Sequence, residues 1–495
     1  MGMRSPRGRL LVAVVAAIVP LLGAAAFAIS AQAATTPKAA GVPVVTGPVT
    51  GGKGNTVLVT TGFDLRTVGY QQSEFFLSGT ARSFLPQGTL GTNGRWRVTP
   101  ASAAPYTTRI VVDRPINPAR FNGTVYVEWL NVSSGFDVAP DWIMAHNELI
   151  RDGFAWIGVS AQALGLNATK AVDPVRYAAL AHPGDSFAYD IYTQTGRAVR
   201  AAAAKILGGL RPRTVLAEGE SQSAFRLTTY IDAIQPTARV YDGFLVHSRA
   251  SGGAGLSQAP QPNVFVPAVV HFRTDLRVPV LALETETDVI TLNYQAARQP
   301  DSRGFRDWEV AGTAHADTYF LGTGFTDNGN GAAGLVELNA MLNPPSSSLG
   351  FTCAKPLNTG PAHYIVDTAH YALNRWVRAG VPPRRAPRLA VTVTGTTPAL
   401  VLDANGNAKG GIRTPEVDAP VATLSGLGQT GASFCFLFGT TAPFAAAKLK
   451  ALYPTHNTFV RRWAAIAVTQ TVRGFIRPAD TAELITAAAG STVGN

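Results

Sequence analysis

Strand-like apolar runs alternate with helix-like segments between residues 123 and 317. Buried strands are predicted within GTVYVEWLNVSSG, ELIRDGFAWIGVSAQ, RTVLAEGE, ARVYDGFLVHS, VPVLALETETD and FRDWEVAGTAHAD. The segment DIYTQTGRAVRAAAAKILGGL, 190–210, predicts a helix that ends at a glycine pair. Alternation of this kind predicts a mostly parallel sheet with helices on both faces. Ligands then bind outside the carboxyl ends of the strands.

Two regions flank this alternation. Residues 42–122 contain short apolar runs broken by glycine and proline, which predict strands joined by turns. Toward the C-terminus, residues 363–380 predict a helix closed by glycine, and residues 442–485 are mainly helical in pattern. We therefore expect a core at 34–320 and a C-terminal extension at 321–495 that completes or caps it.

The stretch AEGESQSAF, 217–225, carries the strongest chemical signal. It is close to G-x-S-x-G, the pattern that presents a nucleophilic serine on a sharp turn from strand to helix. Ser223 replaces the last glycine. The tight turn requires small residues two positions before and after the serine, and Gly219 and Ser223 are both small. Ser221 is therefore the candidate nucleophile; the alternative is a serine that caps a helix.

A nucleophilic serine needs a histidine to remove its proton and a carboxylate to orient that histidine. The loop after VPVLALE offers Glu284, Glu286 and Asp288, and the later loop AGTAHAD offers His315. This matches the chain order nucleophile, acid, histidine. Asp288 is the preferred acid because it lies a few residues past the strand end, and Glu286 is the second choice.

Two backbone amides would complete the site as an oxyanion hole. One is the amide of Gln222, and the other is that of Asn131 or Val132 in the loop NVSSG. His247 ends a predicted strand and is a rival base or a pocket residue, although it precedes the acid. Chemistry of this kind requires no cofactor, and no metal site is predicted.

These segments together resemble the α/β-hydrolase superfamily, and within it the secreted "alpha/beta hydrolase domain" serine esterases. The resemblance is carried by YQQSEFFLSGTA (70–81), VYVEWLNVSSG (125–135), HPGDSFAYDIYTQ (182–194), GESQS (219–223), YDGFLVHSR (241–249), WEVAGTAHADTY (308–319) and GNAKGGIRTP (406–415). It implies an α/β-hydrolase fold, Ser221 and His315 in the catalytic roles, and hydrolysis of an ester whose identity the family does not specify.

Four functions are compatible with this pattern. The first is hydrolysis of a small-molecule or lipid-like carboxylic ester through an acyl-enzyme. The second is acyl transfer by the same triad to an alcohol of the cell envelope. The third is a binding protein that keeps the fold without catalysis. The fourth is a peptidase that uses the same nucleophile. The intact order of serine, acid and histidine argues against the binding protein. The sequence carries no feature that sets an oligomeric state.

The N-terminus predicts export. Arg4, Arg7 and Arg9 precede a long apolar run, and Ala-Gln-Ala follows at 31–33. This is the arrangement of a signal peptide, residues 1–33, cleaved after Ala33. The alternative is an uncleaved membrane anchor at 10–30.

Charge and cysteine content bound the remaining possibilities. Loss of the three arginines lowers the formal net charge from +11 to +8. The remaining positive charge is dispersed and lacks interleaved aromatic residues, which argues against nucleic-acid binding. The positive charge could instead serve a loose association of the protein with an anionic cell envelope. Cys353 and Cys435 are the only cysteines, and an even pair in an exported chain predicts a disulfide; two free thiols are the alternative.

Overall fold

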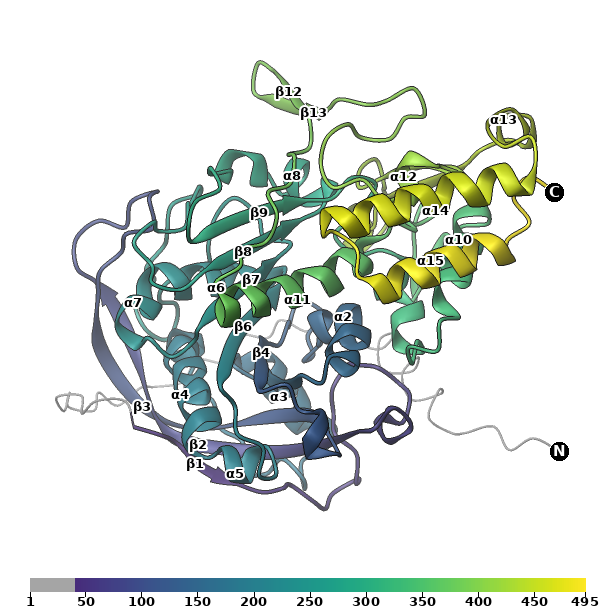
Figure 1. Cartoon of the computed structure of the whole chain (residues 1–495). Coiled ribbons are helices and arrows are strands. Elements are labelled where there is room, and N and C mark those ends of the chain that lie inside the picture. The colour runs from purple at the N-terminus through teal and green to yellow at the C-terminus, as the bar shows by residue number, and fades with distance from the viewer. Residues whose placement is uncertain (1–40) are drawn as a thin grey trace.

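A computed structural model describes residues 41–495, which form a nine-stranded sheet with helices on both faces (Figure 1). The predicted signal peptide and its cleavage site lie outside the described residues. The strands follow the order β1-β2-β3-β5-β4-β6-β7-β8-β9 across the sheet. Their bounds are β1 Val44–Thr46, β2 Tyr70–Pro86, β3 Val98–Pro115, β4 Thr124–Trp129, β5 Ala155–Val159, β6 Thr214–Glu220, β7 Gly243–His247, β8 Val280–Glu284 and β9 Phe305–Glu309.

The sheet is parallel from β5 through β4, β6, β7 and β8 to β9. Strands β1, β2 and β3 pair antiparallel with their neighbours, and β3 pairs antiparallel with β5. The prediction of a mostly parallel sheet is confirmed. The three antiparallel strands come from the glycine- and proline-broken region near the N-terminus, where hairpin connections replace helical crossovers.

Side chains alternate between two hydrophobic clusters along each parallel strand. Leu216 and Leu245 face one cluster, which also contains buried residues of α2 (Pro140–Arg151) and α11 (Ala362–Ala379). Val215 and Val246 face the other, with α4 (Ala188–Ala201) and α6 (Gln222–Thr229). The period of two places successive residues on opposite faces, and both faces are covered. This explains why the strands appear as continuous apolar runs.

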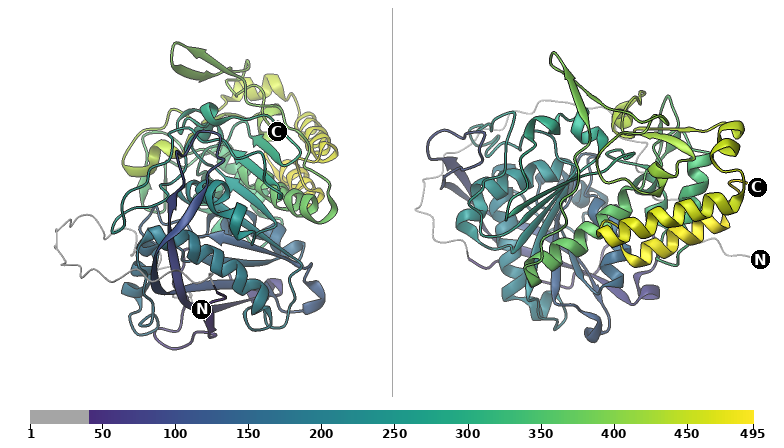
Figure 2. Two further views of the ribbon diagram at one scale, coloured as in Figure 1. Left: turned by 90° about the vertical axis from the view of Figure 1, so that its left-hand side faces the viewer. Right: turned by 45° about the horizontal axis from the view of Figure 1, so that its top comes forward.

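The C-terminal region shares the core of the sheet. Helix α11 begins one residue before the predicted helix and ends at Ala379, where Gly380 caps it with a φ of 67°. Helices α14 (His456–Arg473) and α15 (Pro478–Gly490) lie side by side near α11 (Figures 1 and 2). Their buried Trp463 and Leu484 belong to the same cluster as α11. None of the helices in residues 41–495 combines the length and apolar character needed to cross a bilayer.

Shorter elements connect these layers. The predicted helix at 190–210 is interrupted at Ala202, so that α5 (Ala203–Ile206) follows α4 as a separate turn. The hairpin of β12 (Val391–Thr394) and β13 (Thr397–Leu400) projects from the body (Figure 2). The others are α3 Ala163–Val172, α7 Gln235–Ala238, α8 Glu286–Ile290, α9 Thr318–Leu321, α10 Ala333–Leu342, α12 Pro415–Asp418, α13 Ala446–Leu452, β10 Ser347–Ser348, β11 Phe351–Thr352, β14 Ala422–Ser425 and β15 Thr440–Pro443.

Two fully buried glutamates connect the sheet to its helices. Glu128 of β4 accepts hydrogen bonds from the amides of Asp141 and Trp142 in the first turn of α2, at 3.1 and 3.0 Å. Glu218 of β6 lies 2.7 Å from Nε2 of His370 on α11. A buried carboxyl group needs such partners because its desolvation is costly. His370 therefore serves in packing, as does His363, whose ring stacks on Tyr319 at 3.8 Å.

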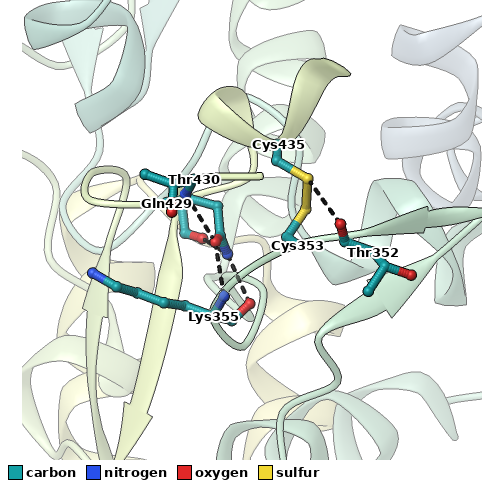
Figure 3. The surroundings of a disulfide bond; sticks show 7 residues. Thr352, Cys353, Lys355, Gln429, Thr430 and Cys435 are labelled. Atoms are coloured by element: carbon teal, nitrogen blue, oxygen red, sulfur yellow. Dashed lines mark hydrogen bonds between the residues drawn. A yellow bond between two sulfur atoms is a disulfide. The ribbon is translucent and has the colours of Figure 1, made fainter. Parts of the chain in front are cut away.

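The disulfide predicted from the two cysteines is present between Cys353 and Cys435 (Figure 3). It joins the chain after β11 to a 3-10 turn, Ser433–Leu437. Gln429 reinforces the same connection, because its side chain accepts from the Lys355 amide at 3.0 Å and donates to the Lys355 carbonyl at 2.9 Å. The turn is thus held to the body at two places.

Removing this disulfide should lower stability substantially. The bridge closes a separation of 82 residues, for which chain entropy alone gives about 4.5 kcal/mol. We expect the double variant Cys353→Ala and Cys435→Ala to lose about 2–5 kcal/mol of unfolding free energy. Denaturant unfolding of both proteins under non-reducing conditions measures this. Equal midpoints would contradict the prediction.

Candidate active site

Ser221 occupies the turn between β6 and α6 with an unusual backbone conformation. Its φ is 58° and its ψ is −119°, in a region that residues other than glycine rarely adopt. Its amide donates to the carbonyl of His247 at 2.9 Å. A Cβ atom on Gly219 would lie 3.2 Å from the backbone of Ser223. Strand and helix therefore approach closely, and the turn presents the Ser221 side chain beyond the strand end.

The structure brings Ser221, His315 and Asp288 together. Nε2 of His315 lies 2.7 Å from Oγ of Ser221, and Nδ1 lies 2.6 Å from Oδ1 of Asp288. The other Asp288 oxygen accepts from the amide and the hydroxyl of Thr285, both at 2.7 Å. Thr285 forms a capping box with Asp288 at the start of α8. The aspartate is thus fixed with one oxygen directed at the histidine.

The two neighbouring carboxylates have other surroundings. Glu286 accepts from the amides of Gly312 and Gly426, at 2.5 and 2.9 Å, and so connects α8 to two distant loops. Glu284 is fully buried, and neither of its oxygens has a hydrogen-bond partner among the described residues. Of the three candidates, Asp288 is the one whose carboxylate faces His315.

Glu220, which sequence reasoning missed, is a second carboxylate beside His315. Its Oε1 lies 3.3 Å from Nε2 of His315. The side-chain amide of Asn131 donates to Oε2 and to the carbonyl oxygen of Glu220, at 3.1 and 3.2 Å. Burial raises the pKa of the Glu220 carboxyl to about 7. Its position is the one sequence feature that could have indicated this role, because Glu220 ends β6 directly before the serine.

The charge state of His315 depends on both carboxylates. Burial lowers the pKa of the imidazole, but Asp288, through its charge and its hydrogen bond, and the charge of Glu220 outweigh that effect. The net result raises the pKa of His315 to about 9. The pKa of Asp288 lies below its usual value, because interactions with His315 and Thr285 overcome the effect of burial, which raises it. Asp288 is therefore ionised at neutral pH.

The predicted oxyanion donors have different surroundings. Gln222 is the first residue of α6, so its amide belongs to the first turn, which has no intrahelical partner. The Asn131 amide donates to the Val138 carbonyl at 2.9 Å. The prediction for Asn131 is therefore corrected: its amide is occupied by a local bridge, and its side chain holds Glu220. Val132 is left as the candidate for the second amide.

His247 contacts the backbone of the serine turn. Its Nδ1 lies 2.8 Å from Oδ1 of Asp141, and its carbonyl accepts from the Ser221 amide. It therefore supports the turn, whereas His315 faces the serine hydroxyl.

A cavity of about 330 Å³ opens beside Ser221 and His315. Phe225, Leu292, Phe436 and Leu437 supply apolar parts of its wall. Phe436 and Leu437 directly follow Cys435, so the disulfide anchors this part of the wall. No pattern in the sequence indicates that these two residues line a cavity beside the serine, because they lie more than 200 positions away. The arrangement can bind a small, largely apolar group next to a hydrogen-bonded serine.

The sequence matches the family described as "Alpha/beta hydrolase domain" over residues 45–486. No curated protein matches it. Among solved structures, an a/b serine hydrolase without lid from Xanthomonas campestris is 13% identical over 48% of this chain and 87% of its own, with a TM-score of 0.27. An esterase from Rhizomucor miehei is 11% identical over 49% and 78%, with the same TM-score. Likeness at this level says nothing about substrate.

The close crossing at Ser221 predicts unequal effects of two substitutions. Gly219→Val should destabilise the fold by about 1–3 kcal/mol, because its side chain would press against the backbone of Ser223. Ser223→Gly, which restores the usual motif, should cost about 1 kcal/mol or less, the ordinary cost of glycine in a helix. Denaturant unfolding compares them. Equal losses would contradict the steric account of the turn.

Proposed function

The chain belongs to the alpha/beta hydrolase domain family, and we propose that it is a serine hydrolase that cleaves carboxylic esters through an acyl-enzyme. One observation carries the proposal. An unbroken line of short hydrogen bonds runs from Asp288 through His315 to Ser221, at 2.6 and 2.7 Å. The serine occupies the strained turn that exposes a nucleophile, and a cavity opens beside it.

Acylation begins when neutral His315 accepts the Ser221 proton at Nε2. The serine oxygen bonds to the ester carbonyl carbon, and the carbonyl oxygen becomes an anion. The amides of Gln222 and Val132 donate to this oxygen. Asp288 stabilises the imidazolium and holds its tautomer. The bond to the alcohol oxygen then breaks, and His315 returns the proton to that oxygen, leaving the acyl group on Ser221.

Deacylation repeats these steps with water as the nucleophile. His315 removes a proton from water, and the water oxygen bonds to the acyl carbon. When the intermediate collapses, the bond to Ser221 breaks and the serine oxygen recovers its proton from His315. The carboxylic acid leaves, and the protein returns to its starting state without any cofactor.

The proposal predicts a burst of product from an activated ester. With p-nitrophenyl acetate, one equivalent of nitrophenol should appear rapidly wherever deacylation is the slower step. Ser221→Ala and His315→Ala should each reduce kcat/KM by about 10⁴-fold or more while remaining folded. Stopped-flow absorbance and circular dichroism test this. Folded variants with nearly full activity would overturn the assignment of the triad.

The rate should also depend on pH in a defined direction. His315 must be neutral to accept the serine proton, and its pKa is raised to about 9. The kcat/KM value should therefore rise from pH 7 with a midpoint near pH 9 and level off above about pH 10. Glu220→Gln removes a neighbouring negative charge that raises the pKa of His315. The midpoint of the rise should then move to lower pH by about one unit. An unmoved midpoint would contradict the role of Glu220.

We also propose that the mature protein is exported and begins at Ala34. The residues before it have the order of a signal peptide, and a disulfide suits an oxidising compartment. Mass spectrometry of the protein from culture medium should find an N-terminal peptide beginning Ala34-Thr35-Thr36. A full-length chain in the membrane fraction would favour the uncleaved anchor instead.

A further inference from the structure

The cavity beside Ser221 contains polar groups that the triad does not use. Arg226 of α6 lines it and is only 5% exposed. Its Nε and Nη1 atoms are buried, and neither has a hydrogen-bond partner among the described residues. Ser248, after β7, also lines the cavity, and its buried hydroxyl has no partner within the same residues. Buried donors without partners are uncommon and costly in folded proteins.

The position of Arg226 is firmly set. Its Nη2 donates to Asp185 at 3.1 Å and to the side-chain carbonyl of Gln258 at 2.9 Å. The Asp185 carboxylate is itself held by the amide of Ala163 at 2.8 Å and the side-chain amide of Gln162 at 3.1 Å. The guanidinium also lies over the ring of Tyr189, 5.8 Å from its centroid. Both hydrogen bonds come from Nη2, and within the described part of the chain neither Nε nor Nη1 has a hydrogen-bond partner.

Ser248 is constrained by its backbone. Its φ is 56°, and its amide donates to the carbonyl of Leu283 at 2.8 Å. A left-handed conformation at a residue other than glycine is uncommon, and such strain gathers at ligand sites. Ser248 is fully buried and belongs to the wall of a cavity whose other lining residues, Phe225, Ala254 and Leu292 among them, are largely apolar.

We propose that this cavity selects esters that carry a second, uncharged oxygen acceptor, such as a ketone or a second ester carbonyl, which Arg226 and Ser248 bind. The inference rests on the proposed ester hydrolysis and names its substrate class. A cavity of about 330 Å³ is at the small end of ligand pockets, which favours short substrates. The acceptor takes hydrogen bonds from the free donors of Arg226 and from the Ser248 hydroxyl, while the apolar wall covers the connecting carbons.

The charge balance favours a neutral acceptor over a carboxylate. The ion pair with Asp185 cancels the charge of Arg226. In the reactive form His315 is neutral, so Glu220 and Asp288 beside it add further negative charge. A substrate carboxylate would lose its hydration on entering the cavity and would find no net positive charge there to compensate. A carbonyl oxygen loses less hydration and gains the same hydrogen bonds. Hydrogen bonds from a charged donor are about twice as strong as neutral ones.

Three methyl esters of similar length test the proposal on the intact protein: methyl pentanoate, methyl 4-oxopentanoate and monomethyl succinate. Titration of released acid at constant pH gives kcat/KM for each. A parallel pair, butyl acetate and 2-oxopropyl acetate, places the ketone in the alcohol portion. We expect about a tenfold preference for the ketone in at least one pair, mainly through a lower KM. Monomethyl succinate should be the poorest substrate of the three methyl esters.

Variants separate recognition from intrinsic reactivity, because the ratio of ketone to alkyl rates is compared between proteins. Arg226→Lys preserves a cation for Asp185 but removes the two free donors, and it should lower the ratio about tenfold. Ser248→Ala should lower it by a smaller factor. Arg200→Met is the control: Arg200 is also paired with an aspartate, Asp242, at 2.7 Å, but it does not line the cavity. Its ratio should equal that of the unmodified protein.

The outcomes are distinguishable. A protein that hydrolyses methyl pentanoate with no ketone preference in either pair overturns the inference and leaves the hydrolase function standing. A preference that persists in folded Arg226→Lys also overturns it. A succinate ester that is preferred over both others would show that the cavity selects an anion, contrary to the proposal. Failure to cleave any ester refutes the proposed function itself.

Discussion

The close crossing of β6 and α6 at Ser221 is the constraint on which the site depends. It requires a serine with φ of 58° and a glycine two residues earlier. A backbone in such a region costs about 1–3 kcal/mol and persists only where the surroundings hold it. Here the buried sheet on both sides and the bond from the Ser221 amide to His247 hold it. The first turn of α6, whose amides have no intrahelical partner, follows Ser221 directly.

Negative charge gathers at the carboxyl ends of the parallel strands. Glu220 ends β6, and Asp288 follows β8 on the first turn of α8. Each is oriented by another side chain, Asn131 for the first and Thr285 for the second. Both lie against His315, and their combined field keeps the imidazole basic although it is buried. The histidine is therefore a strong base held next to a hydroxyl.

The fold and the serine were readable from the sequence because they depend on local patterns. Alternating apolar runs predicted the sheet, and small residues around Ser221 predicted its turn. The side chain that meets His315 depends on three-dimensional contacts. Glu286 is held by the amides of Gly312 and Gly426, which only the folded chain brings near it. The capping box at Thr285 then turns Asp288 toward the histidine.

Other parts of the site had no sequence signal. The Asn131 amide is occupied by Val138, a pairing within a short loop that periodicity does not reveal. Phe436 and Leu437 reach the cavity through a disulfide to Cys353, and the spacing of two cysteines carries no information on which residues lie beside them. Arg226 was visible as a charge in a helix, but its neighbour Asp185 is distant in the chain.

The central claim is that Ser221 is an activated nucleophile. Labelling of the mature protein, residues 34–495, with a fluorophosphonate probe, followed by peptide mapping, tests it most directly, because the probe forms a bond only with an activated serine. The account predicts a single label on Ser221 that disappears in folded Ser221→Ala. A label on another serine, or a folded protein that resists the probe while the cavity admits small molecules, would contradict it.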